Sequence, residues 1–231
     1  ELHASGKRMY KSRIIPYRGS WVEFLIDASD VLYVNIDRRR KLPATILLRS
    51  LGYGTNEQIL ELFYESEAVM VNDTTAEGLE GRILFKEIID EETGELIAES
   101  NTALTSVIIS KVIDAGIPEV VIIKDSLEDF PVIHNTIAAD PTDNQEDALF
   151  KIYSLVCPGD PPNAATAQML FDKLFFDEKR YDLGQVGRYR LNSRLKHEVD
   201  IEKLTMTPQD FMSIIKYMVD LDESVDFTKY K

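Results

Sequence analysis

An alternating hydrophobic pattern near the start of the chain constrains the fold most strongly. Within residues 21–27, apolar Val22, Phe24 and Ile26 alternate with residues of the other parity, which is the period of a β-strand with one buried face. Ser and Asp after this run predict a turn, and residues 31–36 predict a second strand, so the two form a β-hairpin. The chain therefore requires a sheet with one face against a core.

A turn before this hairpin and a basic cluster after it frame the sheet. Gly19 follows Pro16 closely, and we expect it to adopt positive φ in a turn. The only Trp, Trp21, begins the first strand on the parity opposite the apolar residues. We therefore expect its indole on the outer face, although a buried core position is the competing interpretation.

The basic cluster follows Asp37 and consists of Arg38, Arg39, Arg40 and Lys41. Pro43 suits the first turn of a helix, which Gly52 would end. The positive end of that helix dipole adds to the four side-chain charges. The pattern predicts a site for an anion, whereas a solvated surface run is the alternative.

Charge is unevenly distributed along the 231 residues, whose net charge is −14. Residues 1–50 hold about ten cations and five anions, roughly +5, whereas residues 65–140 hold about four cations and seventeen anions, roughly −13. The average therefore hides a basic region that could bind nucleic acid. The start at Glu1 without Met and the polar end predict a piece of a longer protein.

The pattern of elements predicts an α+β fold, a mixed helical and β domain interrupted by a small inserted α/β subdomain. We place the main domain at residues 1–64 and 138–231, and the acidic insertion at residues 65–137, with a hairpin plus a helix. The insertion should contain strands at 68–71, 82–89, 96–99 and 120–124 and a helix at 105–115. Further helices are expected at 144–156, 163–175, 186–195 and 207–221, with Asn163 and Thr207 as N-caps of the second and the fourth.

No catalytic constellation is visible. The three His residues, including His134 beside an apolar run expected to be a strand, have no Cys, Asp or Glu at metal-ligand spacing. There is no Gly-rich phosphate loop and no nucleophile elbow. Cys157, the single cysteine, cannot form an internal disulfide and suits a buried position. No apolar run could span a bilayer and no signal peptide is present.

A second basic cluster lies in the expected helix at 186–195 and just after it. Its members are Arg188, Arg190, Arg194 and Lys196. Cations spaced along one face can meet phosphates, but an ion pair of Arg188 or Arg190 with nearby Asp182 is an equally weighted interpretation.

Several ordered sequence blocks run through the chain. They are IIPYRGSW at 14–21, IDRRRKLPAT at 36–45, DPTDN at 140–144, PGDPP at 158–162, LFF at 174–176, RYDL at 180–183 and VGR at 186–188. These blocks resemble the lobe of the β subunit of bacterial RNA polymerase. The resemblance covers essentially the whole chain, and the insertion is similar to a lineage-dependent one.

The resemblance implies a non-catalytic wall of the cleft that holds downstream DNA, within a DNA-directed nucleotidyltransferase. It implies that Trp21 stacks on a non-template base and that Asp37 and Arg38 lie beside the non-template strand. The other expected DNA contacts are Arg39, Arg40, Lys41, Arg188 and, less directly, Arg190, since the family usually has Lys there.

The same resemblance implies partners, cofactors and location. Partners would be downstream DNA, the β′, α and ω subunits and a sigma factor, with no membrane, in the cytoplasm at the nucleoid. No cofactor is expected in this piece, because Mg²⁺ of the whole polymerase is held by another subunit. The alternative is an acidic protein-docking module for transcription factors, without direct DNA contact.

Overall fold

The structure is a computed structural model that describes residues 9–72, 74–124 and 131–223. It divides into two compact units, Glu1–Gly54 with Pro131–Lys231 and Thr55–Phe130. Both boundaries of the second unit lie earlier than the expected 65 and 137. Helix α5 (Val132–Ala138) contacts β3 (Leu32–Ile36) of the first unit, and Glu57 of α2 (Asn56–Glu61) accepts a hydrogen bond from the Glu87 amide. The insertion limits of 65 and 137 stay predictions.

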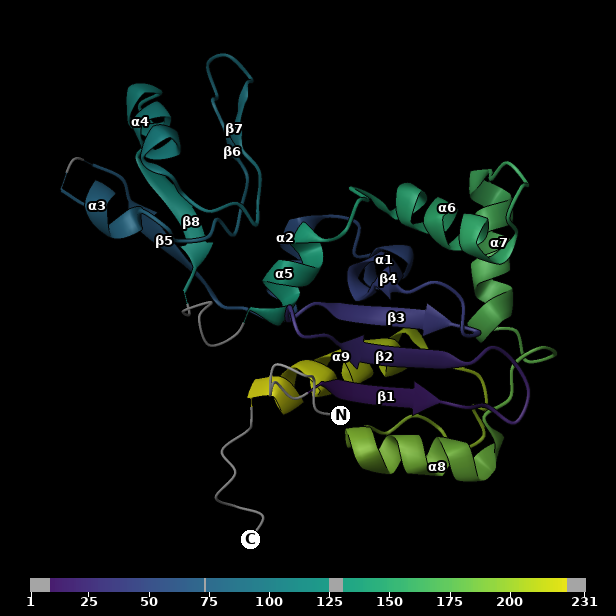
Figure 1. The fold of residues 1–231 in the computed structure, drawn as a ribbon. Helices are drawn as coiled ribbons and strands as arrows, with labels where there is room; N and C mark the ends of the chain where they lie inside the picture. Colours follow the sequence, from purple (N-terminus) through teal and green to yellow (C-terminus); the bar gives the residue numbers. More distant parts are fainter. Residues whose placement is uncertain (1–8, 73, 125–130, 224–231) are drawn as a thin grey trace, which may run out of the picture. The chain divides into compact units, whose positions relative to one another are not determined.

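The first unit is built on a four-stranded antiparallel sheet in the order β1-β2-β3-β4 (Figure 1). Its strands are Tyr10–Ile14, Val22–Ile26, Leu32–Ile36 and Leu42–Pro43. The predicted hairpin is confirmed, because β2 pairs with β3. Val22, Phe24 and Ile26 are buried, as their alternation predicts.

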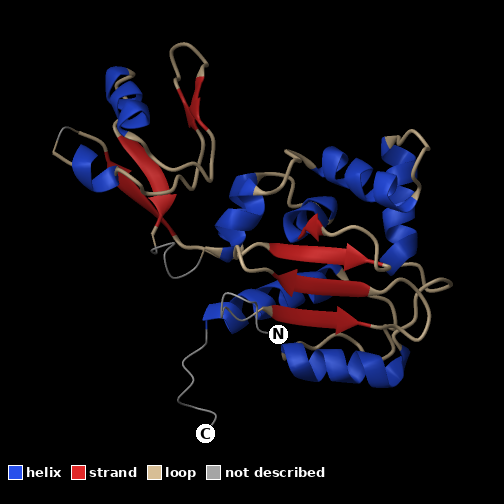
Figure 2. Cartoon of the chain, viewed as in Figure 1, coloured by secondary structure: helices blue, strands red, loops and turns tan. Residues whose placement is uncertain are grey.

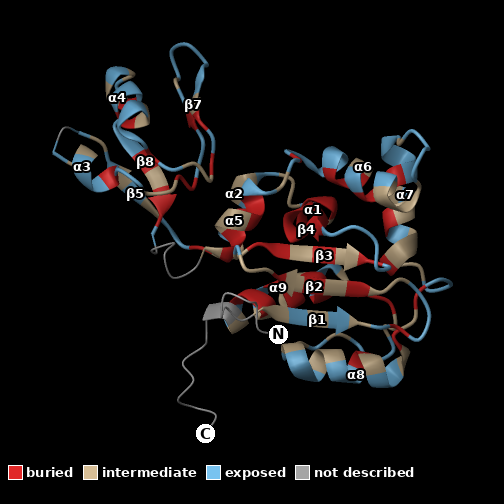
Figure 3. Ribbon diagram, viewed as in Figure 1, coloured by how far each residue is buried: buried red, intermediate tan, exposed pale blue. Residues whose placement is uncertain are grey.

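Helices cover one face of this sheet and leave the other open. Helix α9 contacts β1 and β2, while α1 and α5 contact β3; Figure 1 shows α9 behind the sheet and α8 beside β1. Every residue of α1 is buried, and Figure 3 shows buried residues concentrated there and in the central strands. The remaining bounds are α1 Ala44–Ser50, α6 Gln145–Val156, α7 Ala164–Phe175, α8 Gly184–Leu195 and α9 Pro208–Glu223.

Side-chain caps fix where several of these helices begin. Asn144 and Asn163 accept hydrogen bonds from the amides of Asp147 and Thr166 at 2.9 Å each, and Thr207 accepts one from Asp210 at 3.2 Å. Each bond satisfies an amide that has no partner within the first helical turn. The N-caps predicted for α7 and α9 are therefore confirmed.

The second unit combines two small sheets and short helices around its own core (Figure 2). Strands β5 and β8 pair, as do β6 and β7, with Leu84, Val112 and Ile122 fully buried between elements. The elements are α2 Asn56–Glu61, β5 Ser66–Met70, α3 Ala76–Leu79, β6 Ile88–Ile89, β7 Leu96–Ala98, α4 Ser106–Asp114 and β8 Glu119–Ile123. The fold is α+β, as expected.

Three local predictions are corrected. The strand expected over 82–89 is reduced to β6, because Ile83 and Leu84 form only isolated bridges with different neighbours. The apolar run beside His134, expected to be a strand, belongs with His134 to helix α5. Pro43 ends β4 and precedes the first residue of α1, instead of occupying that helix's first turn.

Candidate nucleic-acid interface

The turn before β2 is held firmly against the body of the first unit. The Arg18 amide donates to the Asp182 carbonyl at 3.1 Å, and the Asp182 amide donates back at 2.7 Å. Gly19 has φ +122°, as predicted, and a Cβ there would lie 2.6 Å from the Tyr181 ring. No residue other than Gly fits this close contact with the Tyr181 ring. The turn therefore fixes the position of the backbone that leads into Trp21.

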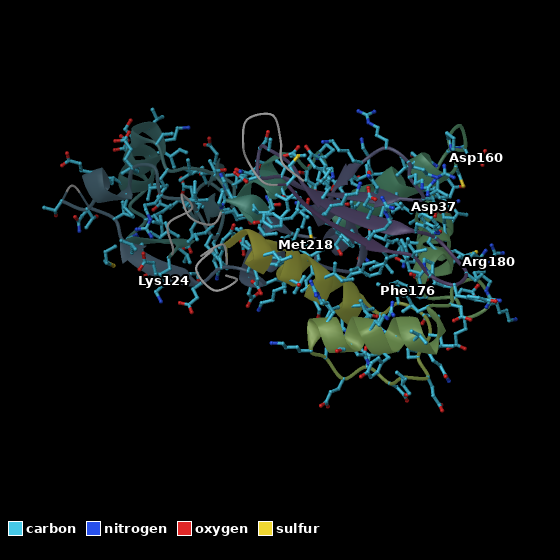
Figure 4. The ribbon with its side chains drawn as sticks, turned by 60° about the horizontal axis from the view of Figure 1, so that its bottom comes forward. Asp37, Lys124, Asp160, Phe176, Arg180 and Met218 are labelled. Carbon is cyan, nitrogen blue, oxygen red and sulfur yellow. The ribbon has the colours of Figure 1, made fainter. Side chains whose placement is uncertain are left out.

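Asp37 fixes Trp21 from the opposite side. The Trp21 amide donates to Asp37 Oδ1 at 2.7 Å, and the Asp37 amide donates to the Trp21 carbonyl at 2.9 Å. Asp37 and Arg38 both adopt left-handed backbone conformations, with φ +50° and +58°. Two such non-glycine residues in succession are strained, and strain of this kind gathers at functional sites. The turn lies where β3 ends (Figure 4).

This turn directs Arg38 onto Trp21. The Arg38 guanidinium carbon lies 4.5 Å from the indole centroid, a cation–π contact. The indole is partly exposed and borders a recess of about 250 Å³ with Arg13, Glu23 and Asn35. The indole thus lies on the outer face of the sheet, as predicted, and the Arg38 guanidinium lies over its ring.

Cross-strand neighbours supply the charges around this recess. Arg13, Glu23 and Asn35 occupy one register row of β1, β2 and β3. Glu23 pairs with Lys11 at 2.9 Å and with Arg13 at 2.5 Å. Burial raises the pKa of Glu23, but hydrogen bonds and charges from the two cations outweigh it, so its pKa lies below the ordinary value. Glu23 is therefore an anchor that orients both cations.

Tyr33, a second aromatic residue on the open sheet face, also has a cation above its ring. Lys41 Nζ lies 3.7 Å from the Tyr33 ring centroid and 3.4 Å from Asp27 Oδ2. Both residues border a groove of about 630 Å³ that also includes Arg40 and Lys151. Arg40 is exposed, and among the described residues the three cations that border this groove outnumber its one carboxylate, Asp147.

Arg39 has a structural role that its position in the basic cluster does not reveal. Its Nη1 donates to the carbonyls of Leu155 and Val156 at 2.8 and 3.1 Å. These are the last carbonyls of α6, which lack partners within the helix. The guanidinium therefore caps α6, and a phosphate contact of this exposed side chain, which stays a prediction, would compete with the cap.

Arg188 is withdrawn from the expected contacts, because its side chain is 0% exposed. It forms a two-pronged ion pair with Asp210, Nη1–Oδ1 at 2.7 Å and Nη2–Oδ2 at 3.0 Å. It also donates to the Lys203 carbonyl at 2.7 Å and to the Thr205 carbonyl. Arg188 therefore forms an ion pair, as the alternative interpretation expected, but with Asp210 and not with Asp182. Asp182 instead accepts a hydrogen bond from the Gly184 amide.

The rest of the second cluster lies beside β1. Arg190 and Arg194 are exposed and border a groove between β1, α8 and α9, and Arg194 lies 5.1 Å from the Tyr217 ring centroid. Lys196 ends α8 in a left-handed conformation. Arg13 borders both this groove and the Trp21 recess, so Arg190 is a neighbour of the recess but not part of it.

The described residues contain no group of three or more His, Cys, Asp or Glu side chains able to hold a metal ion. No helix among them is long and apolar enough to cross a membrane.

Comparison with known proteins identifies the family. The family model described as RNA polymerase Rpb2, domain 2, matches residues 1–94 and 111–225. This chain belongs to that family. The β-subunit resemblance is confirmed: DNA-directed RNA polymerase subunit beta of Bacteroides thetaiotaomicron is 38% identical over 96% of the chain, and that of Protochlamydia amoebophila is 40% identical over 95%. The chain spans 19% and 18% of these relatives, about a fifth of their length.

Sequence reasoning missed several residues of this Rpb2-type domain. Arg13, Glu23 and Tyr33 shape the open sheet face, although none belongs to a charge run or a recognised block. Their shared parity along β1, β2 and β3 was the available signal, because residues two apart in a strand share a face. The pairing register needed to join them became known only with the structure.

Proposed function

We propose that this domain is the lobe of an RNA polymerase β subunit and that its open sheet face lines the downstream DNA cleft, contacting the non-template strand. It would act within a polymerase that contains the β′, α and ω subunits and recruits a sigma factor. The relatives, which are β subunits of DNA-directed RNA polymerase, support the polymerase assignment. The DNA contact is supported chiefly by one observation, the Arg38 guanidinium held over a partly exposed Trp21.

The geometry suits an unpaired base beside a phosphate. A partly exposed indole offers a stacking surface worth about 1–3 kcal/mol per base, and Arg38 adds a charge that a neighbouring phosphate can approach. Asp37 is an anion and binds no phosphate; it fixes the backbone of Trp21 through two hydrogen bonds. Arg40 and Lys41 extend the positive surface toward β4.

Fluorescence polarisation with forked and fully paired DNA at low salt tests this function. Trp21→Ala should weaken binding to the fork about tenfold while leaving duplex binding nearly intact, because only the fork presents an unstacked base. Arg38→Ala should weaken both and reduce the salt slope by about one.

Matched controls come from the same surface region. Tyr17 is 87% exposed and lies outside the sheet, so Tyr17→Ala should not change fork binding. Arg180→Ala is the control for Arg38→Ala, because the Arg180 side chain is 64% exposed. It should not change DNA binding. Equal losses in Trp21→Ala and Tyr17→Ala would remove the stacking role, and an unaffected Arg38→Ala would remove the phosphate contact.

A second function, docking of transcription factors, is favoured by the surface of the second unit. Met70, Ile89, Leu96 and Val107 are large apolar side chains that lie exposed there. The β6–β7 turn beside Ile89 and Leu96 carries exposed Glu91, Glu92 and Glu95. Apolar residues flanked by like charges fit a partner with a basic rim.

Replacing residues 55–130 by a short Gly-Ser linker separates the two functions. If the two functions are divided as proposed, DNA binding persists and affinity for a sigma factor falls. Loss of DNA binding in a variant that remains folded would assign the contact to the second unit instead.

A further inference from the structure

The groove beside β1 is a surface that the proposed DNA contact does not use. It has a volume of about 580 Å³ and is bounded by residues 11–14 of β1 and by residues of α8 and α9. Figure 1 shows α8 running beside β1, and Figure 4 shows α8 and α9 together, with Met218 on α9. Such a volume is typical of ligand-binding clefts.

The first wall of the groove is β1 from Lys11 to Ile14, the edge strand of the four-stranded sheet. Among the described residues β1 pairs only with β2. A strand with one unpaired side presents backbone amides and carbonyls to which another extended chain can hydrogen-bond. The groove follows β1 from Lys11 to Ile14 and continues to Ile15, which is 55% exposed.

The second and third walls provide apolar contacts. Leu191 and Leu195 of α8 are partly exposed, and Ile214, Met218 and Leu221 of α9 also border the groove. A peptide strand laid along β1 would direct alternate side chains to opposite faces. One set would meet these apolar residues, and the other would meet the outer face of the sheet.

The charged side chains that border the groove are cations, as far as the chain is described. They are Lys11, Arg13, Arg190 and Arg194, and no Asp or Glu among the described residues borders it, although the chain carries a net charge of −14. Lys11 and Arg13 share Glu23 on the outer face but keep side-chain exposures of 35% and 42%. Arg190 has no ion pair among the described residues. The groove therefore complements an anionic partner.

We propose that this groove binds an extended acidic segment of a partner protein, which adds as a strand to the edge of β1. Acidic side chains at alternate positions meet Lys11 and Arg13, and apolar ones pack against α9. A cationic edge can also serve only to discourage pairing, but that role does not require an apolar groove behind the edge.

The test uses a fluorescein-labelled peptide of about eight residues with alternating Asp and Val, long enough to cover β1. Polarisation should show saturable binding that Arg190→Glu with Arg194→Glu weakens at least about tenfold. Lys216→Glu is the matched control, because Lys216 is exposed on α9 and does not border the groove. It should leave the affinity unchanged.

A second arm needs no protein variant. N-methylation of alternate peptide residues should abolish binding in one register and spare it in the other, because alternate residues of an added strand bond to the edge. Equal sensitivity of both registers would overturn strand addition.

Competing occupants are excluded by parallel probes. Equally tight binding of a Lys-Val peptide or of single-stranded oligothymidine would overturn the acidic-peptide assignment. Self-association lost in the same double variant would assign the groove to a second copy of the chain. Binding to this chain but not to the assembled polymerase would assign the groove to another segment of the same subunit and refute a separate partner.

Discussion

Removal of Arg188 distinguishes most clearly a structural cation from a DNA contact. Arg188→Ala would leave Asp210 as a carboxylate with 0% exposure and without its guanidinium partner. The Thr207 amide and hydroxyl would remain as donors to Asp210, at 2.8 and 2.9 Å. The Lys203 and Thr205 carbonyls would lose a donor as well.

The cost follows from the burial of this pair. Breaking a buried ion pair by removing one partner costs about 3–5 kcal/mol, a large part of the roughly 5–15 kcal/mol that stabilises a typical domain. Replacing both members by apolar residues of similar volume, Arg188→Met with Asp210→Leu, should recover much of that loss, because no uncompensated charge remains buried.

Urea unfolding followed by tryptophan fluorescence is a suitable assay, because Trp21 is the only Trp and lies in the first unit. The single variant should have a much lower midpoint with an unchanged slope, and the double variant should lie closer to the parent. A loss under about 1 kcal/mol in Arg188→Ala, together with DNA affinity reduced as in Arg38→Ala, would refute the structural role.

Three other substitutions test the framework of the site. Gly19→Ala should lower the free energy of unfolding by about 1–3 kcal/mol, because its Cβ would meet the Tyr181 ring and its φ is +122°; an unchanged urea midpoint would contradict this. Arg39→Ala should cost about 1 kcal/mol through the lost α6 cap while DNA affinity stays within twofold of Arg180→Ala; a selective affinity loss would support Arg39 as a contact. Because the folded-state pKa of Glu23 is lowered, its stabilising contribution is present above the unfolded pKa and is lost as pH falls through the folded value. Glu23→Gln should therefore flatten the stability profile below about pH 4.5, and an identical acid profile would contradict the pairing.

Local rules predicted the elements that depend on neighbouring residues. The period of two placed Val22, Phe24 and Ile26 inside, and the cap of α7 followed from Asn163. These features arise from bonds between residues close in sequence. The strand expected over 82–89 failed because apolar content alone does not supply a partner strand along its whole length.

The roles of individual arginines could not be predicted in the same way. From the sequence, Arg38, Arg39 and Arg188 were all candidates for a contact with a DNA phosphate. The structure separates them by what lies opposite: an indole for Arg38, helix carbonyls for Arg39 and a buried carboxylate for Arg188. The partners of Arg39 and Arg188 are distant in sequence, and the contact of Arg38 with Trp21 depends on an unusual turn. Composition and residue spacing therefore carried no signal for these contacts.

The most direct test of the central claim places 2-aminopurine at the first unpaired non-template position of a forked DNA and measures its fluorescence on binding. Stacking on the indole predicts that the parent chain and Tyr17→Ala quench the fluorescence at saturation, whereas Trp21→Ala does not. Equal quenching by all three would contradict the claim that Trp21 and Arg38 together form the surface that receives an unpaired base.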